Sequence, residues 1–121
     1  MGEIPIYALC KASSAITALL GNKPRVYRFG QAPSKPTLPY VTWQQITGYP
    51  ENNLSDRPDY DYLSIQIDIY GIDADSSDAV KEALVDAIEA ITNITAWNGE
   101  GRDGATTNYR ITFSVDWFIG R

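Results

Sequence analysis

The stretch that decides the fold is YLSIQIDIY, residues 62–70. Aliphatic side chains occupy every second position, and smaller or polar side chains occupy the positions between them. A period of two is typical of a β-strand with one face against a core. The core face comprises Leu63, Ile65, Ile67 and Ile69, and the other face carries Ser64, Gln66 and Asp68. The sequence therefore predicts a central strand over residues 62–70.

A second long strand is predicted over residues 109–119, where apolar and polar residues alternate in the same way. Two further strands are expected at 25–29 and at 40–47, the latter rich in β-branched and aromatic residues. Three prolines within residues 31–39 predict an irregular connector, because proline lacks the N–H that a sheet ladder needs. Polar turn residues predict a long exposed loop over 48–60, and glycines predict a mobile one over 98–107.

Two amphipathic helices are predicted. Over residues 4–20, apolar side chains recur at spacings of three and four, and Gly21 provides a stop signal. The second helix follows the segment 75–78, which we expect to cap it, and carries an apolar stripe from Val80 to Ile91. The order helix-strand-strand-strand-helix-strand predicts an α+β two-layer sandwich. We expect a mainly antiparallel sheet of about four strands, with both helices on one face.

Residues 1–121 are expected to form a single domain, because no internal repeat and no linker divides them. No apolar run approaches the ~18 residues that a membrane span needs, and no basic and apolar leader opens the chain. We therefore expect a cytoplasmic protein without a membrane partner.

Charge is distributed unevenly along the chain. The net charge of −5 argues against a nucleic-acid-binding protein, which usually carries a basic stripe. Residues 1–50 have a balance of +4, whereas residues 51–121 have a balance of −9. If the two halves occupy different sides of the fold, the protein has a positive and a negative face, which would orient stacked protein layers. If folding intermixes the halves, no such polarity results.

Residues that carry catalytic or metal chemistry are sparse. The chain has no histidine, which removes the usual neutral-pH acid/base and most zinc chemistry. Cys10 lies on the apolar stripe of the first helix, so a structural role is expected. Asp68 and Asp116 are predicted to share a sheet face, and nearby Arg110 gives them an electrostatic rather than a catalytic role.

Two motif-like segments lack their required context. Asp73, Asp75 and Ser77 resemble the start of a calcium loop, but Asp78 stands where glycine is needed. Residues 99–104 spell G-x-G-x-x-G, yet a helix precedes them and a strand follows, the reverse of a dinucleotide site. We therefore predict no catalytic residue, no cofactor and no metal.

Aromatic residues are predicted on the sheet face that points away from the helices. Tyr62, Tyr70 and Phe118 would lie there beside Arg110 and Asp116. Scattered surface aromatics are common, but Tyr and Phe are also enriched in interface cores. We expect these five residues to contact a neighbouring subunit or layer. The loops at 48–60 and 98–106 supply further candidate contacts, represented by Asp56, Arg57 and Arg102.

Several ordered segments carry a resemblance to a known family. They are PIYAL (5–9), RVYRFG (25–30), PYVTWQQITGYPEN (39–52) and IQIDIYG (65–71). In order and spacing they resemble the tail completion, or tail terminator, proteins of long-tailed bacteriophages and prophages. The resemblance covers most of the chain and carries over no catalytic residue.

This resemblance implies a structural role in the virion tail. Such proteins cap the end of a tail tube as a ring, usually of six copies, and join it to the head-tail connector. Expected partners are therefore further copies of the chain, the tail tube protein and the connector protein, with DNA passing through the channel without specific binding. The expected place is the head-proximal end of the tail, after assembly in the host cytoplasm. Two alternatives remain: another phage component, such as a stopper or tail tube protein, and a small enzyme of unknown family.

Overall fold

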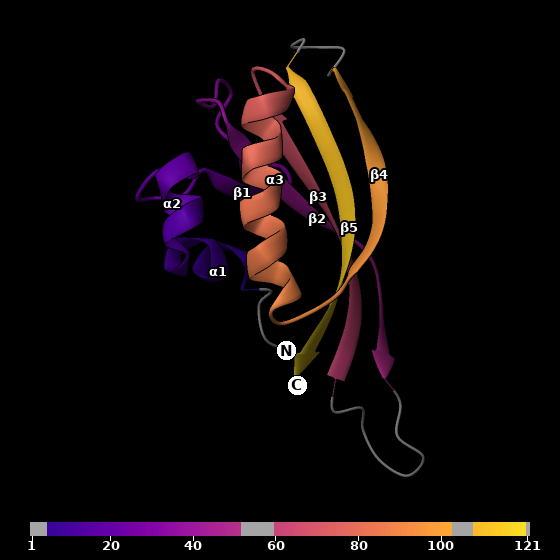
Figure 1. The fold of residues 1–121 in the computed structure, drawn as a ribbon. Coiled ribbons are helices and arrows are strands. Elements are labelled where there is room, and N and C mark those ends of the chain that lie inside the picture. The colour runs from indigo at the N-terminus through magenta and orange to yellow at the C-terminus, as the bar shows by residue number, and fades with distance from the viewer. Residues whose placement is uncertain (1–4, 52–59, 103–107, 121) are drawn as a thin grey trace.

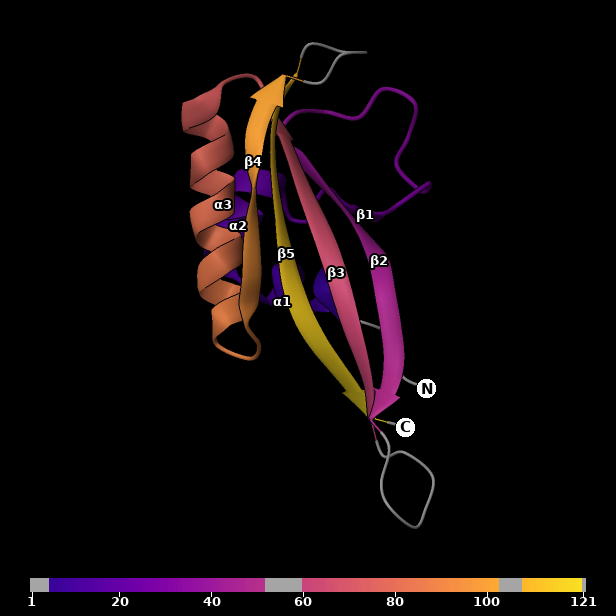
Figure 2. The ribbon, with the colours of Figure 1, turned by 90° about the vertical axis from the view of Figure 1, so that its right-hand side faces the viewer.

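The computed structural model describes residues 5–51, 60–102 and 108–120, and it packs helices against one side of a twisted sheet (Figure 1 and Figure 2). The described elements are α1 (Ile6–Ala12), α2 (Ser14–Leu20), β1 (Val26–Arg28), β2 (Tyr40–Glu51), β3 (Tyr60–Gly71), α3 (Ala74–Glu89), β4 (Ile94–Arg102) and β5 (Tyr109–Gly120). The α+β class and the two layers agree with the prediction. Within the described residues, however, the sheet has five strands rather than four, and there are three helices rather than two.

The sheet is mainly antiparallel, as expected. Its strand order is β1-β2-β3-β5-β4, and only the short β1 pairs parallel to its neighbour among the described strands. The central strand β3 is hydrogen-bonded to β2 on one side and to β5 on the other. In Figure 1 the lower ends of β2, β3 and β5 extend past the end of α3, so the sheet is longer than the helix that covers it.

The predicted helix over residues 4–20 is divided in two. Ser13 has extended backbone angles (φ −93°, ψ 118°), and its Oγ accepts a hydrogen bond of 3.3 Å from the Ile16 N–H. A serine hydroxyl can cap a new helix in this way, and it does so here at the start of α2. The apolar stripe survives the break, because Ile6 and Cys10 of α1 and Ile16 and Leu20 of α2 are all buried.

The mobile loop predicted over residues 98–107 is wrong for residues 98–102, which belong to β4. This strand pairs antiparallel with β5, with register shifts between Ile94 and Ala96 and between Trp97 and Gly99. Gly99 has a φ of 103°, a conformation that other L-residues rarely adopt. The glycines thus accommodate an irregular edge strand instead of breaking it.

The loop predicted over residues 48–60 is shorter than expected, because residues 48–51 continue β2 and Tyr60 begins β3. Gly48 lies opposite Leu63, and a Cβ at Gly48 would approach a Leu63 methyl to 2.8 Å. Gly48 therefore allows close packing between two strands. The remainder of that predicted loop, 52–59, lies outside the described residues.

Helix α3 begins earlier and ends earlier than predicted. Its N-cap is Asp73, whose carboxylate accepts a 2.9 Å hydrogen bond from the Ser76 N–H. This hydrogen bond lowers the pKa of Asp73, since it stabilises the charged form. The helix ends at Glu89, which leaves Ile91 outside the apolar stripe and 58% exposed.

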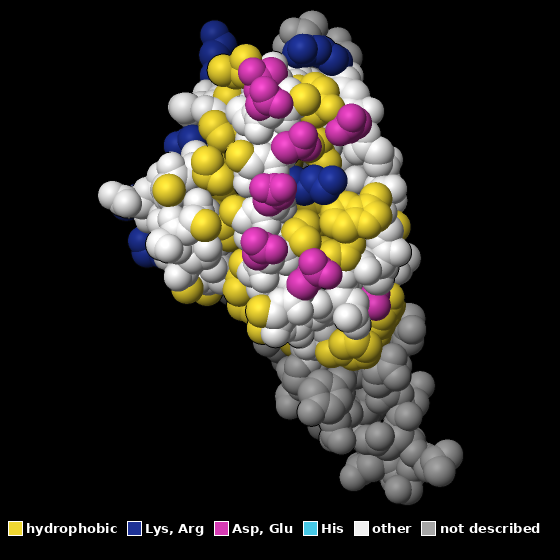
Figure 3. Space-filling model, in the orientation of Figure 1, with side chains coloured by type: hydrophobic (Ala, Val, Ile, Leu, Met, Phe, Trp, Pro, Cys, Tyr) yellow, Lys and Arg dark blue, Asp and Glu magenta, His cyan; other side chains and the backbone are white. Residues whose placement is uncertain are grey.

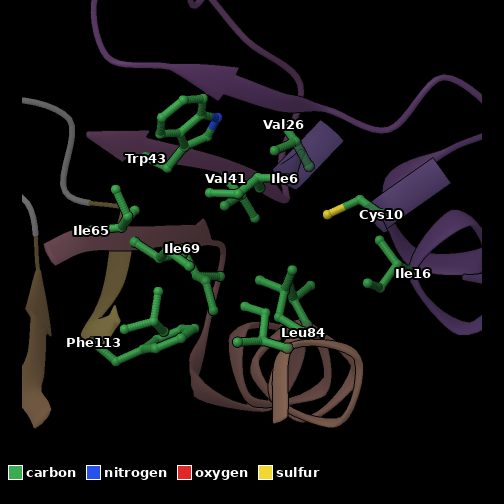
Figure 4. Close-up of a cluster of buried hydrophobic side chains, with 14 of the residues drawn as sticks. Ile6, Cys10, Ile16, Val26, Val41, Trp43, Ile65, Ile69, Leu84 and Phe113 are labelled. Carbon is green, nitrogen blue, oxygen red and sulfur yellow. The ribbon is translucent and has the colours of Figure 1, made fainter. Parts of the chain in front are cut away.

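The core lies between the helices and the sheet (Figure 4). The predicted inward faces of the two long strands are buried, including Ile65, Ile67 and Phe113 at 0% exposure. Leu84 of α3 and Cys10 of α1 reach the same cluster from the helical layer. Burial raises the pKa of the Cys10 thiol from 9.0 to about 12, so this thiol behaves as a small apolar group.

Candidate assembly surface

The open face is the side of the sheet that points away from the helices. Because side chains alternate along each strand, the residues between the core positions of β3 and β5 point to this face. The register places them in rows across β2, β3 and β5: Tyr40, Tyr70 and Arg110; Thr42, Asp68 and Thr112; Gln44, Gln66 and Ser114; Thr47, Ser64 and Asp116. One further row includes Tyr62 opposite Phe118.

The first two rows form the Arg110 cluster, built from Tyr40, Tyr70, Asp68, Arg110 and Thr112. The Tyr40 and Tyr70 rings stack with centroids 4.7 Å apart, and the Arg110 guanidinium lies 6.0 Å from the Tyr70 ring. The Arg110 Nη2 donates to Asp68 Oδ1 at 3.1 Å, and the Thr112 hydroxyl donates to the same oxygen at 2.6 Å. Asp68 is only 5% exposed, so its carboxylate is held by side chains of β3 and β5 and not by bulk water. The electrostatic role predicted for Arg110 beside Asp68 is confirmed by this ion pair.

The Phe118 cluster consists of Tyr62, Asp116 and Phe118 at the other end of the open face. The Tyr62 hydroxyl donates to an Asp116 carboxylate oxygen, and the Tyr62 ring meets the Phe118 ring edge-on at 5.4 Å. Phe118 remains 50% exposed. Tyr62 and Tyr70 are eight residues apart on β3, which separates the two clusters by about 27 Å at the usual rise per residue. The five predicted open-face residues therefore form two patches and not one.

The other predicted contact residues lie elsewhere. Arg102 ends β4, where its Nη1 donates to the Ile72 carbonyl at 3.4 Å and its guanidinium lies 6.0 Å from the Tyr109 ring. A hydrogen bond to Glu100 raises the pKa of the Tyr109 hydroxyl at the same end of the sheet. Asp56 and Arg57 lie outside the described residues.

Nothing in the sequence indicated the hollow with a mixed polar and apolar lining that lies beside the Arg110 cluster. It has a volume of about 450 Å³ and lies between the proline-rich connector and the sheet, lined among others by Phe29, Pro33, Leu38, Tyr40 and Tyr70. Phe29 is 69% exposed. The aromatic character of Tyr40 was visible in the sequence, but its place on the open face follows only from its pairing with Tyr70.

The helical side of the molecule carries a line of negative charge (Figure 3). Five exposed carboxylates follow α3 at helical spacing: Asp75, Asp78, Glu82, Asp86 and Glu89. Cations of the first half of the chain are placed on other elements, such as Lys11 on α1 and Arg28 on β1. The separation is incomplete, because Lys81 lies among the carboxylates of α3, and Arg110 and Asp116 share β5.

The chemistry that this surface offers is that of binding. Within residues 5–51, 60–102 and 108–120, no three Cys, Asp or Glu side chains gather as a metal site. None of the helices in the described part is long and apolar enough to cross a bilayer. The surface consists of stacked aromatics, an ion pair held by hydrogen bonds and a charged helix, all of which can form contacts with another protein.

The model of the family described as tail completion protein gp17 matches residues 4–120. The chain belongs to this family. The resemblance found in the sequence is thereby confirmed, and it makes the protein a phage tail structural component. No curated protein sequence gives a significant match.

One solved structure supports the fold of this tail completion protein. A chain of the "Virion of native gene transfer agent (GTA) particle" superimposes with a TM-score of 0.69 at 15% sequence identity. The match covers 96% of this chain and 92% of the other. At this identity the likeness is one of fold.

Proposed function

We propose that this tail completion protein caps the head-proximal end of the tail tube as a ring, most simply a hexamer. In this proposal the ring presents a surface to the head-tail connector and surrounds a channel through which DNA passes without specific binding. The observation that carries the proposal is the family match over residues 4–120, which covers almost the whole chain. The chain would act as a structural protein of a single domain, without catalysis.

Features of the surface support an assembly role. A cyclic ring uses a heterologous interface, in which one patch of a subunit meets a different patch of its neighbour. The Arg110 cluster and the Phe118 cluster are two different patches on one face, available for contacts with a neighbouring subunit or with the next layer. The acidic stripe of α3 supports a channel or layer contact that does not attract DNA, because like charges repel.

Deletion of the gene in a phage that encodes this protein tests the proposal. If the protein caps the tube, tails that lack it should grow to uncontrolled lengths and fail to join heads, as seen by electron microscopy. Supplying the wild-type gene in trans should restore tails of uniform length. Tails of normal length that carry heads, in the absence of the protein, would contradict the capping role. Normal tails that lack heads would instead limit the role to joining.

A further inference from the structure

We propose that the ring closes through its sheets: the outer edge of β4 pairs antiparallel with the free part of the β2 edge in a neighbouring copy. This inference rests on the proposed function, since it specifies how one subunit of the ring contacts the next. We call this strand pairing the seam.

Both ends of the sheet present backbone without a strand partner among the described residues. β4 is the last strand of the sheet and pairs with β5 on one side only. At the opposite end, β1 covers β2 only at Val41–Trp43, which leaves residues 44–51 of β2 as the free β2 edge. Proline is tolerated in edge strands, and Pro50 lies within this edge. Unpaired edges of this length readily accept a strand from another chain.

The strand directions make the two edges complementary. β2 and β5 run in one direction, whereas β3 and β4 run in the other. In a cyclic ring every copy has the same orientation relative to the axis. β4 of one copy therefore meets β2 of the next in the antiparallel sense, and the alternation continues across the seam without interruption.

The two edges are also offset along the strands by the amount that a closed sheet requires. β4 pairs directly with residues 109–115 of β5. Residues 44–51 of the free β2 edge are aligned, through β3, with residues 114–120 of β5. The centres of these segments, Thr112 and Trp117, are five residues apart, or about 17 Å. The repeat from β2 of one copy to β2 of the next comprises three strand spacings within the sheet and one across the seam, about 19 Å in all, so the offset corresponds to a strand tilt of about 40°. Strands of closed barrels tilt by about 35–45°.

Each edge carries an exposed apolar side chain that a seam would cover. Ile46 of the free β2 edge is 50% exposed and lies at the register shift between Gln45 and Thr47. Trp97 of β4 is 57% exposed, contacts the core ring of Phe113 and lies under the Lys81 amine of α3, which places it on the helical side. Ile46 has no register partner and lies between Gln45, which pairs with the inward-facing Ile65, and Thr47, which pairs with Ser64 of the open face. A seam would bring the two exposed apolar residues close together at the junction of the two sheets.

Cysteine cross-linking between two singly substituted chains tests the seam. Ile46→Cys and Trp97→Cys are made separately, co-expressed in one sample and treated with a short bismaleimide, with native mass spectrometry on the same samples. The buried Cys10 should not react with the bismaleimide, and the unsubstituted chain is the control for this. Tyr7→Cys, on the exposed side of α1, replaces Ile46→Cys in the matched control.

The seam predicts closed oligomers and a covalent pair that contains one copy of each variant, formed only in the Ile46→Cys and Trp97→Cys mixture. Closed oligomers without this pair, or with equal cross-linking in the Tyr7→Cys control, would overturn the seam and leave the ring proposal standing. Open ladders of cross-linked chains would support the strand pairing and contradict ring closure. A mixture that stays monomeric and gives no cross-link at any protein concentration tested would also overturn the seam.

Discussion

The ring of Tyr62 on β3 meets the ring of Phe118 on β5 edge-on, with centroids 5.4 Å apart and planes inclined by 66°. Tyr62 is anchored by its hydrogen bond to Asp116, whereas Phe118 leaves half of its surface exposed. This pair gives the lower end of the open face a rigid aromatic edge, of the kind that is enriched in interface cores.

Phe118→Asp should weaken self-assembly more than folding. Loss of the aromatic pair should cost the monomer about 0.5–1.5 kcal/mol, whereas a charge at an interface centre should cost assembly about 2 kcal/mol or more. Thermal unfolding and native mass spectrometry at equal concentrations measure the two effects. Tyr7→Asp, at another exposed aromatic, is the matched control and should leave assembly unchanged. A Phe118→Asp monomer without a cooperative melt would instead assign Phe118 to the core.

Gly71→Ala should destabilise the fold, because its Cβ would approach the Ser77 Oγ to 2.2 Å. Overpacking of this kind costs about 1–3 kcal/mol. The Ser77 Oγ is buried and has no hydrogen-bond partner among the described residues, so Ser77→Ala should be neutral or stabilising. The double variant should therefore recover part of the lost free energy of unfolding, as measured by urea titration. Strictly additive single effects would contradict this account.

Cys10 should resist thiol reagents in the folded protein. Its pKa is raised to about 12 by burial, against 9.0 for an exposed thiol, so the folded state binds the proton more tightly. The stability that this provides is fully present below pH 9 and is lost as the pH rises toward 12. A chromogenic disulfide reagent should react at pH 8 only after denaturant is added. Rapid reaction of the native protein would place the thiol at the surface.

Thr112→Val should lower stability by about 1–3 kcal/mol, because it removes the hydroxyl that donates to the buried Asp68 carboxylate at 2.6 Å. The change keeps the shape and the strand propensity of the side chain. Ser114→Val, in the next row of the same strand, is the comparison; it removes an exposed hydrogen bond from Asn98 and should cost less. Chemical denaturation checks both variants, and equal losses would show that the buried hydrogen bond to Asp68 contributes no more than the exposed one at Ser114.

The long strands were predictable because one of their faces is buried and the other is not. β3 and β5 each bury every second side chain, so apolar and polar residues alternate in their sequences. β4 lacks this signal, since its residues are mostly exposed and two of them are glycines. Edge pairing with β5 determines β4, and no local pattern reports that pairing.

The helical stripe was predictable, but the break within it was not. Ile6, Cys10, Ile16 and Leu20 keep helical spacing across Ser13, so one helix and two short helices give the same pattern. The capping hydrogen bond of Ser13 decides between them, and this depends on how each half packs on α3 and β1.

The sequence predicted which face of the sheet carries the candidate surface, but it did not predict how the residues are arranged on that face. Alternation placed Tyr62, Tyr70, Arg110, Asp116 and Phe118 on one side of the sheet. Only the register shows that Tyr70 lies opposite Arg110 and Tyr62 opposite Phe118, at separate ends. Tyr40 and the free edges of β2 and β4 escaped notice, because they become significant only when strands that are distant in sequence are aligned.

Native mass spectrometry of the purified chain across a concentration series tests the ring proposal most directly. The account predicts one discrete closed oligomer, a hexamer at about six times the 13.4 kDa chain mass, with rings visible by electron microscopy. A chain that remains monomeric throughout the series, and that still fails to form rings when tail tubes are added, would contradict it.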